Sequence, residues 1–140
     1  MQKILNYRMK TRNIKVKVVI KAPAHEIYEA LMDSRKHSKL TGDKSSISRK
    51  VGGKIKAYGK YIEGKNLKLV KDKKIVQLWR ASDWPKKHFS TVTFLLKEKK
   101  GKTTLLFTQI KVPILGKGMD VTAPAWNLYY WRPLKLMLEK

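Results

Sequence analysis

The chain has 140 residues, a net charge of +23 at pH 7 and no cysteine. This length predicts one domain, and the lack of cysteine excludes disulfides, thiolate metal sites and thiol nucleophiles. No run of about 18 apolar residues could span a membrane, and the first residues lack the apolar core of a signal peptide, so we expect a cytoplasmic protein.

The first part of the chain predicts a lead-in, a strand and two short helices. Residues 1–11 are basic and weakly patterned, and we expect them to precede a single domain over residues 12–140. Apolar residues then alternate with polar ones, as in a half-buried strand, at Ile14, Val16, Val18 and Ile20. Pro23 opens a short helix, and Ser34 caps a second one that ends near Leu40.

Six further runs have the composition of strands. They span residues 45–51, 54–62, 66–70, 75–81, 88–98 and 103–112. Turn-forming residues separate them at Gly52-Gly53, Glu63-Gly64-Lys65, Lys71-Asp72-Lys73, Trp84-Pro85 and Lys99-Lys100-Gly101. Because short turns join antiparallel neighbours, the sequence predicts a seven-stranded antiparallel sheet.

Alternation also predicts which side chains of the last three strands face inward. These are Ile75, Gln77 and Trp79, then Val92, Phe94 and Leu96, then Leu105, Phe107 and Gln109. Arg80 falls on the opposite face, where we expect it to pair with Asp83 or to stack on Trp84. Trp84-Pro85 predicts a rigid extended turn. The alternative, functional interpretation is that this pair forms an exposed aromatic contact for a protein partner.

Residues 122–140 predict one long aromatic helix, with Thr122 as its N-cap and Pro124 in its first turn. At about 100° per residue, one face carries Trp126, Tyr129, Tyr130, Pro133, Leu134, Leu136 and Met137. Arg132, Lys135 and Glu139 fall opposite, and Pro133 should kink the helix. Strands followed by such a helix indicate an α+β fold in which the sheet covers the aromatic face.

Several strings, in this order, resemble a known family. They are Ala22-Pro23, Val51-Gly52-Gly53, Gly64 before the next predicted strand, the run from Ile75 to Arg80, Trp84-Pro85, Ser90-Thr91-Val92, the run from Thr103 to Gln109, Val112-Pro113, and the run from Trp126 to Leu138. Together they resemble the C-terminal domain of the heat-shock protein 90 ATPase activators, within the START-like (SRPBCC) helix-grip superfamily. The resemblance implies a curved seven-stranded sheet around a long C-terminal helix, with two short helices after the first strand. It also raises the expectation of an apolar ligand between helix and sheet.

We therefore predict a non-catalytic domain that binds a small apolar or amphipathic molecule, without a cofactor and as a monomer. The predicted cavity residues are Gln77, Trp79, Phe94, Phe107, Gln109, Trp126, Tyr130 and Met137, and the alternative is that they only fill the core. The resemblance implies a second hypothesis, a chaperone-associated module. In that case Trp84 and Arg80 contact an acidic partner such as an Hsp90-type chaperone.

The sequence gives no pattern for a catalytic or metal site. No two carboxylates share an inward face, so a general acid/base pair is not predicted. The remaining route to enzyme activity is cyclase-like positioning by Gln77, Gln109 or Tyr130. The three histidines lack metal-ligand spacing, and we expect them to face solvent at His25, His37 and His88.

Lysine supplies most of the charge, with 27 of the 33 basic residues against 10 acidic ones. Three interpretations remain open: a solubilising surface, electrostatic binding of nucleic acid, or attraction to an anionic membrane. Arginine, the residue that reads bases, is scarce in this chain.

Overall fold

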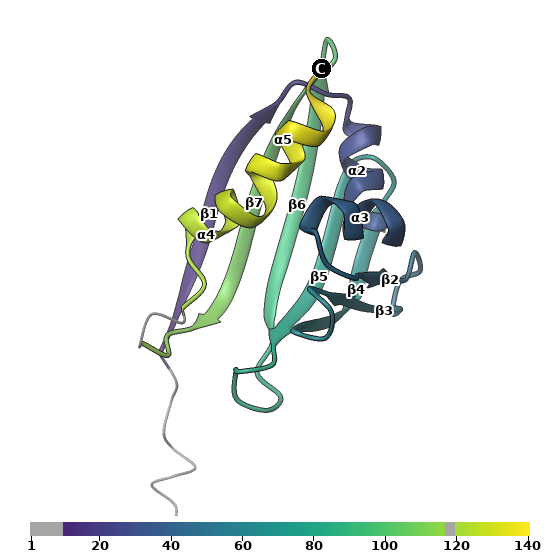
Figure 1. Ribbon diagram of the computed structural model, residues 1–140. Helices are drawn as coiled ribbons and strands as arrows, with labels where there is room; N and C mark the ends of the chain where they lie inside the picture. The colour runs from purple at the N-terminus through teal and green to yellow at the C-terminus, as the bar shows by residue number, and fades with distance from the viewer. Residues whose placement is uncertain (1–9, 117–119) are drawn as a thin grey trace, which may run out of the picture.

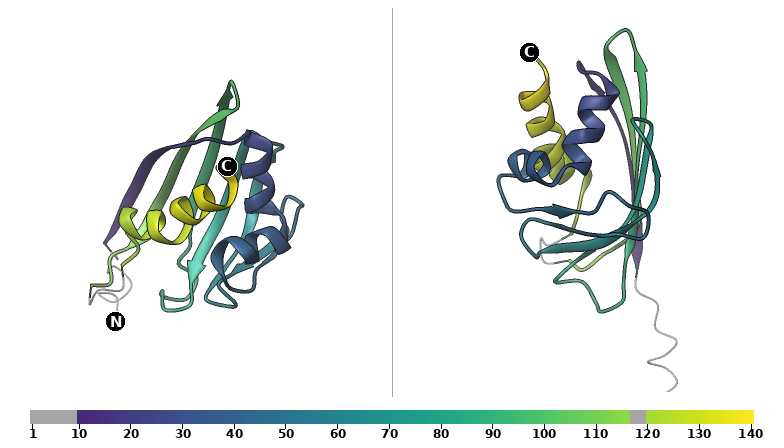
Figure 2. Two further views of the ribbon diagram at one scale, coloured as in Figure 1. Left: turned by 45° about the horizontal axis from the view of Figure 1, so that its top comes forward. Right: turned by 90° about the vertical axis from the view of Figure 1, so that its right-hand side faces the viewer.

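The computed structural model describes residues 10–116 and 120–140. It consists of one curved antiparallel sheet with the helices on its concave side (Figure 1, Figure 2). The strand order is β1-β7-β6-β5-β4-β3-β2, and every neighbouring pair is antiparallel. The predicted α+β architecture, with a curved seven-stranded sheet around the last helix, is confirmed.

The strands match the predicted runs in number and order. They are β1 (Thr11–Ile20), β2 (Ser46–Ile47), β3 (Lys54–Ala57), β4 (Ile62–Val70), β5 (Lys74–Ala81), β6 (Ser90–Lys99) and β7 (Lys102–Pro113). Side chains of β5, β6 and β7 alternate between buried and half-exposed, as predicted. Most of the predicted lead-in lies outside the described residues, and its last residue, Thr11, already pairs with Pro113.

The predicted turn at residues 63–65 is wrong, because this segment lies inside β4. Gly64 pairs with Trp79 of β5, and a Cβ atom at Gly64 would lie 1.7 Å from the backbone oxygen of Leu78. The glycine therefore permits a close approach of two strands rather than a turn. The chain reverses instead at residues 58–61.

The helices are α2 (Ala24–Met32), α3 (Ser34–Thr41), α4 (Ala123–Trp126), η1 (Asn127–Trp131) and α5 (Arg132–Leu138). Asp33, not the predicted Ser34, is the N-cap of α3, and its side chain accepts a hydrogen bond from the Lys36 N–H at 3.0 Å. The Ser34 hydroxyl accepts instead from the Ile47 N–H at 2.7 Å, which ties α3 to β2. Within the described residues, no helix is long and apolar enough to cross a membrane.

The C-terminal segment begins at the predicted N-cap but is not one continuous α-helix. The Thr122 hydroxyl accepts from the Ala125 N–H, as predicted. The next turn, η1, is a π-helix, in which the Arg132 N–H donates to the Asn127 oxygen five residues earlier. A π turn holds one residue more than an α turn, so every later side chain is displaced by one position, about 100°.

This displacement decides which aromatic rings reach the core. Trp131 moves to the inward face and is 2% exposed, whereas Leu136 takes the outward place predicted for Lys135 and is 77% exposed. The prediction that Tyr129 and Leu136 face the sheet is therefore wrong, and the burial of Trp131 was missed. The predicted inward positions of Trp126, Tyr130 and Leu134 are confirmed, since each side chain is at most 4% exposed.

Pro133 lies in the first turn of α5, where a missing N–H is tolerated. Because Pro133 has no N–H to offer the Tyr129 oxygen four residues earlier, that oxygen accepts instead from the Tyr58 hydroxyl at 3.1 Å. Burial raises the pKa of Tyr58 to about 12, so its hydroxyl stays protonated and donating. The last helix is thus fastened to the turn between β3 and β4.

Candidate functional site

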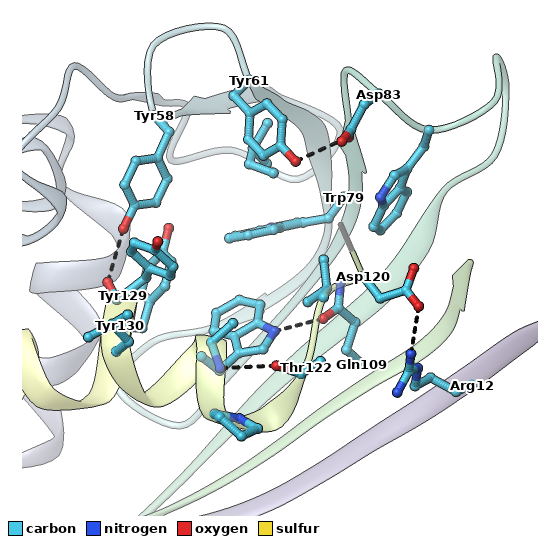
Figure 3. A pocket seen from close by; sticks show the side chains of 17 residues that line it. Arg12, Tyr58, Tyr61, Trp79, Asp83, Gln109, Asp120, Thr122, Tyr129 and Tyr130 are labelled. Carbon is cyan, nitrogen blue, oxygen red and sulfur yellow. Dashed lines mark hydrogen bonds and ion pairs between the residues drawn. The ribbon is translucent and has the colours of Figure 1, made fainter. Parts of the chain in front are cut away.

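A pocket of about 770 Å³ lies between the start of the last helix, the turn at residues 58–61 and the end of β5 (Figure 3). Its floor consists of aromatic side chains that are less than 6% exposed: Trp79, Trp84, Trp126 and Tyr130. Its rim consists of more exposed side chains: Tyr58, Tyr61, Leu128 and Tyr129. A concave, mostly apolar site of this size suits a small-molecule ligand.

The aromatic floor is a direct result of strand and helix periodicity. Inward alternation along β5 places Trp79 on the concave face, and the end of α4 brings Trp126 against it, with ring centroids 5.1 Å apart. Tyr130 follows four residues later, and its ring centroid is 4.8 Å from that of Trp126 and 5.9 Å from that of Trp79. Contacts of this kind are favourable beyond the area they bury.

Two glutamines satisfy the indole N–H groups of this floor. The Nε1 of Trp79 donates to the Gln77 side-chain oxygen at 2.8 Å, and the Nε1 of Trp126 donates to the Gln109 side-chain oxygen, also at 2.8 Å. The amide nitrogens of both glutamines are engaged by neighbouring side chains as well. Both glutamines therefore act as internal hydrogen-bond partners, and these two indoles need no donor or acceptor from a ligand.

Tyr130 makes a buried hydrogen bond with His37. The Tyr130 hydroxyl lies 2.8 Å from His37 Nε2, and His37 Nδ1 lies 2.9 Å from the Leu31 backbone oxygen. Because a carbonyl only accepts, Nδ1 carries the proton and Nε2 accepts from Tyr130. Burial raises the pKa of Tyr130 well above its ordinary value and lowers the pKa of His37, so both are neutral.

The expectation that all three histidines face solvent is thus wrong for His37, which is 3% exposed. The helical position of His37 aims its ring at the last helix, and two hydrogen-bond partners compensate its burial. His25 is exposed, as predicted, and His88 is half-buried. Within residues 10–116 and 120–140, no three side chains of metal-binding type converge on one point.

One carboxylate of the pocket, Asp120, is fully engaged. One of its oxygens accepts from the Leu115 N–H at 2.6 Å and the Gly116 N–H at 3.0 Å, and the other pairs with the Arg12 guanidinium at 2.9 Å. The Leu115 and Gly116 N–H groups, followed by Arg12, hold the pKa of Asp120 below its usual value. The two side chains therefore form a neutral pair at the edge of the pocket.

The second carboxylate, Asp83, has a single partner in the described structure. One Asp83 oxygen accepts from the Tyr61 hydroxyl at 3.1 Å. Burial, followed by the hydrogen bond to Asp83, raises the pKa of Tyr61, so the hydroxyl remains a donor. In Figure 3, Asp83 and Tyr61 lie on one side of the Trp79 ring, and Arg12 and Asp120 lie on the other.

The pocket brings together half of the predicted cavity residues. Trp79, Gln109, Trp126 and Tyr130 line it, whereas Gln77, Phe94, Phe107 and Met137 do not. Phe94 and Phe107 are buried in the core beside Trp131. Alternation predicts the face of a strand but not the position along it: Phe94 pairs with Ile75, at the other end of β5 from Trp79.

Trp84 and Arg80 differ from the prediction in detail. Trp84 is 4% exposed and lines the pocket, so the alternative interpretation of Trp84 as an exposed aromatic contact is wrong. Arg80 does not pair with Asp83. Its guanidinium donates to the backbone oxygens of Pro85 at 3.0 Å and Trp84 at 2.5 Å, and it lies 3.5 Å from Glu63. Arg80 thereby fixes the loop that carries Trp84, and a partner contact by either residue stays a prediction.

Most of the rim and all of the charged groups of the pocket were not predicted from the sequence. The missed side chains that matter most here are Arg12, Tyr58, Tyr61, Asp83, Asp120 and Leu128. They come from five separate segments, and only the folded chain brings them together. A local signal existed for the two tyrosines, since both flank Gly59 in a turn that the sequence analysis placed inside a strand.

Comparison with known proteins identifies related chains. Residues 21–139 match the family model described as Activator of Hsp90 ATPase homolog 1-like protein. An uncharacterized protein of Schizosaccharomyces pombe is 31% identical over 125 residues, which cover 89% of this chain and 37% of that protein. The human activator of 90 kDa heat shock protein ATPase homolog 1 is 26% identical over 128 residues, which cover 91% of this chain and 37% of that protein. The chain thus spans less than two thirds of the length of these relatives.

Solved structures share the fold. An HSP90 activator from Plasmodium falciparum superposes with a TM-score of 0.81 at 23% identity, over 89% of this chain and 94% of that chain. The solution structure of an Aha1 dimer from Colwellia psychrerythraea gives a TM-score of 0.76 at 25% identity, over 91% of this chain and 96% of that chain.

Proposed function

This chain belongs to the Activator of Hsp90 ATPase homolog 1-like family, and from that premise we propose that it is a non-catalytic START-like domain that binds a small apolar or amphipathic molecule. The observation that carries the proposal is the pocket of about 770 Å³ with an aromatic floor. Binding sites for small molecules are typically concave, largely apolar and supplied with few polar groups.

The state of the polar groups supports binding rather than catalysis. Gln77, Gln109 and Tyr130, the three side chains considered for cyclase-like positioning, are each hydrogen-bonded to protein neighbours. A general acid or base needs a proton that it can exchange with a substrate within hydrogen-bond reach. Using any of these groups would require breaking a buried hydrogen bond first.

A ligand panel tests the proposal directly. Three of the four tryptophans line the pocket, so an occupant should change the intrinsic fluorescence. We expect saturable binding of at least one class among fatty acids, sterols and aromatic metabolites. The same compound should raise the melting temperature, because a ligand that binds only the folded state stabilises it.

Two exposed leucines of the last helical segment provide a matched pair of variants. Leu128 is 54% exposed and lines the pocket, whereas Leu136 is 77% exposed and lies outside it. We expect Leu128→Arg to weaken binding by about tenfold, the effect of losing one apolar contact and adding a charge, and Leu136→Arg to leave binding unchanged. Equal effects of the two substitutions, or no binding by any class, would contradict the proposal.

A second candidate function is that of a chaperone-associated module that contacts an acidic protein. Relatives named as activators of the 90 kDa heat shock protein ATPase favour it. The loop fixed by Arg80 also presents two exposed lysines, Lys86 and Lys87, in a chain of net charge +23. Complementary charge mainly speeds and orients association.

The second candidate predicts stimulated ATP hydrolysis by an Hsp90-type chaperone at low salt. Reversing the charge of Lys86 and Lys87 to glutamate should abolish the stimulation. The matched control reverses Lys99 and Lys100, which lie at the hairpin between β6 and β7, at the opposite end of the sheet (Figure 1). An unchanged ATPase rate with the cognate chaperone would reject this function.

A further inference from the structure

Asp83 differs from the other acidic side chains in its surroundings. Eight of the ten acidic residues pair with a basic side chain or a backbone N–H: Glu29, Asp33, Asp43, Glu63, Asp72, Glu98, Asp120 and Glu139. Among the described residues, Glu26 and Asp83 have no such partner. Glu26 is exposed at the start of α2, whereas Asp83 is half-buried in the wall of the pocket.

The charge of the pocket is opposite to that of the molecule. The chain has 33 basic residues and a net charge of +23, yet no lysine of residues 10–116 and 120–140 lines the pocket. Arg12 is the one cationic side chain among the lining residues that the structure describes, and Asp120 neutralises it. Among the described lining residues, the negative charge of Asp83 therefore has no compensating positive charge. Because no described cation pairs with Asp83, in a protein that has cations in large excess, this carboxylate is available to a cation from outside.

The surfaces around Asp83 are also suited to a cation. Trp79 and Trp84 line the same pocket, and Trp79 directs its N–H away to Gln77. Ring faces attract alkylammonium groups through the negative face of the π system, most strongly in sites shielded from water. An anion at the same place would meet the negative charge of Asp83, and the indole N–H groups of Trp79 and Trp126 already donate to glutamine oxygens.

We infer that the ligand of this pocket is a cationic amphiphile, a small molecule with an ammonium head beside Asp83 and an apolar body along Trp126 and Leu128. The inference rests on the proposed binding function and narrows its ligand class. It runs against the overall field of the protein, which attracts anions. At physiological salt that field is screened beyond roughly 8 Å, so a preference for cations can only arise from groups within the pocket.

Three probes with one tail and different heads test the inference: decyltrimethylammonium, a neutral decyl glycol ether and decyl sulfate. Binding is measured by titration calorimetry at about 0.15 M salt and below micelle-forming concentrations, and circular dichroism verifies that the protein stays folded. We expect the cation to bind at least about tenfold more tightly than the sulfate. We also expect Asp83→Asn to remove about tenfold of the cation's affinity and to leave that of the neutral ether unchanged.

Asp83→Asn keeps an oxygen that accepts from Tyr61, so the loop should stay folded. Asp72→Asn is the matched control, because it removes the same charge from a residue that pairs with His25 outside the pocket. An effect of equal size in both variants would overturn the inference. Tight binding of the ether with equal or weaker binding of the cation would overturn it too but leave the proposed function intact. Failure of all three probes would refute both.

Discussion

Two tryptophans stacked on each other provide the sharpest test of how the last helix docks. The rings of Trp126 and Trp131 are 5.5 Å apart and nearly parallel, at 21°, and both side chains are at least 96% buried. Their N–H groups differ: that of Trp126 donates to Gln109 at 2.8 Å, whereas that of Trp131 has no hydrogen-bond partner within the described residues. Replacing each by phenylalanine removes similar apolar area but changes the hydrogen bonding in opposite directions.

The magnitudes follow from this difference. Trp126→Phe leaves the buried Gln109 oxygen without a donor, which costs about 1–3 kcal/mol in addition to the lost ring area. Trp131→Phe removes a donor that is already unpaired, so a penalty of about 1–3 kcal/mol disappears and offsets the lost area. We therefore expect Trp126→Phe to lower the free energy of unfolding by at least about 2 kcal/mol more than Trp131→Phe does.

Urea denaturation followed by far-ultraviolet circular dichroism measures both free energies without relying on tryptophan emission. The m-values should stay unchanged, so that the midpoints report stability alone. In a Gln109→Leu background, Trp126→Phe should cost less, since no acceptor is left to be orphaned. The reasoning is refuted if Trp131→Phe is as destabilising as Trp126→Phe, or if the Gln109→Leu background changes nothing.

Three further outcomes are expected. Gly64→Ala should lower the free energy of unfolding by about 3 kcal/mol or more, measured by urea denaturation, because its Cβ would meet the backbone oxygen of Leu78. Gly101→Ala, in open space at positive φ, should lower it by only about 1–2 kcal/mol. Burial lowers the pKa of His37 in the folded state. The contribution of His37 to stability is therefore complete above its pKa in the unfolded state, about 6.5. It is lost as the pH falls towards the folded-state pKa, because the unfolded state takes up the proton first. Melting temperatures of wild type and His37→Gln between pH 8 and pH 5 should show this slope only in the wild type. Hydrogen bonds lower the pKa of Asp120 in the folded state. Asp120 therefore stabilises the fold above its pKa in the unfolded state, about 4, and this stabilisation is lost as the pH falls below that value. Acid denaturation at the same pH in Asp120→Asn and in wild type would contradict this prediction.

The outline of the fold was predictable because it rests on local rules. A period of two along β5, β6 and β7 predicted which side chains are buried, and the structure places Trp79, Phe94 and Phe107 accordingly. The N-cap at Thr122 also followed from a short local motif. The resemblance to the family extended these local predictions to the arrangement of sheet and helix.

The pocket was predictable only in part, because its rim depends on events that have no local signature. A helical projection at a constant 100° per residue predicts that Tyr129 and Leu136 face the sheet, and it does not predict the burial of Trp131. The cause is a single π turn, whose extra residue becomes favourable only when the rings dock against the sheet. Gly64 was wrongly predicted to lie in a turn because its role also depends on tertiary contacts. A glycine in a turn and a glycine where two strands approach closely cannot be distinguished in a sequence.

By itself, the sequence determined the seven strands, the aromatic segment at the carboxyl end and the excess of positive charge, because alternation, capping and composition are properties of neighbouring residues. The tertiary structure alone decided that His37 is buried against Tyr130, that Asp120 neutralises Arg12 and that Asp83 has no cationic partner among the described residues. These pairings join residues up to 108 positions apart. Their energies depend on distance and burial in space, which the order of residues along the chain does not specify.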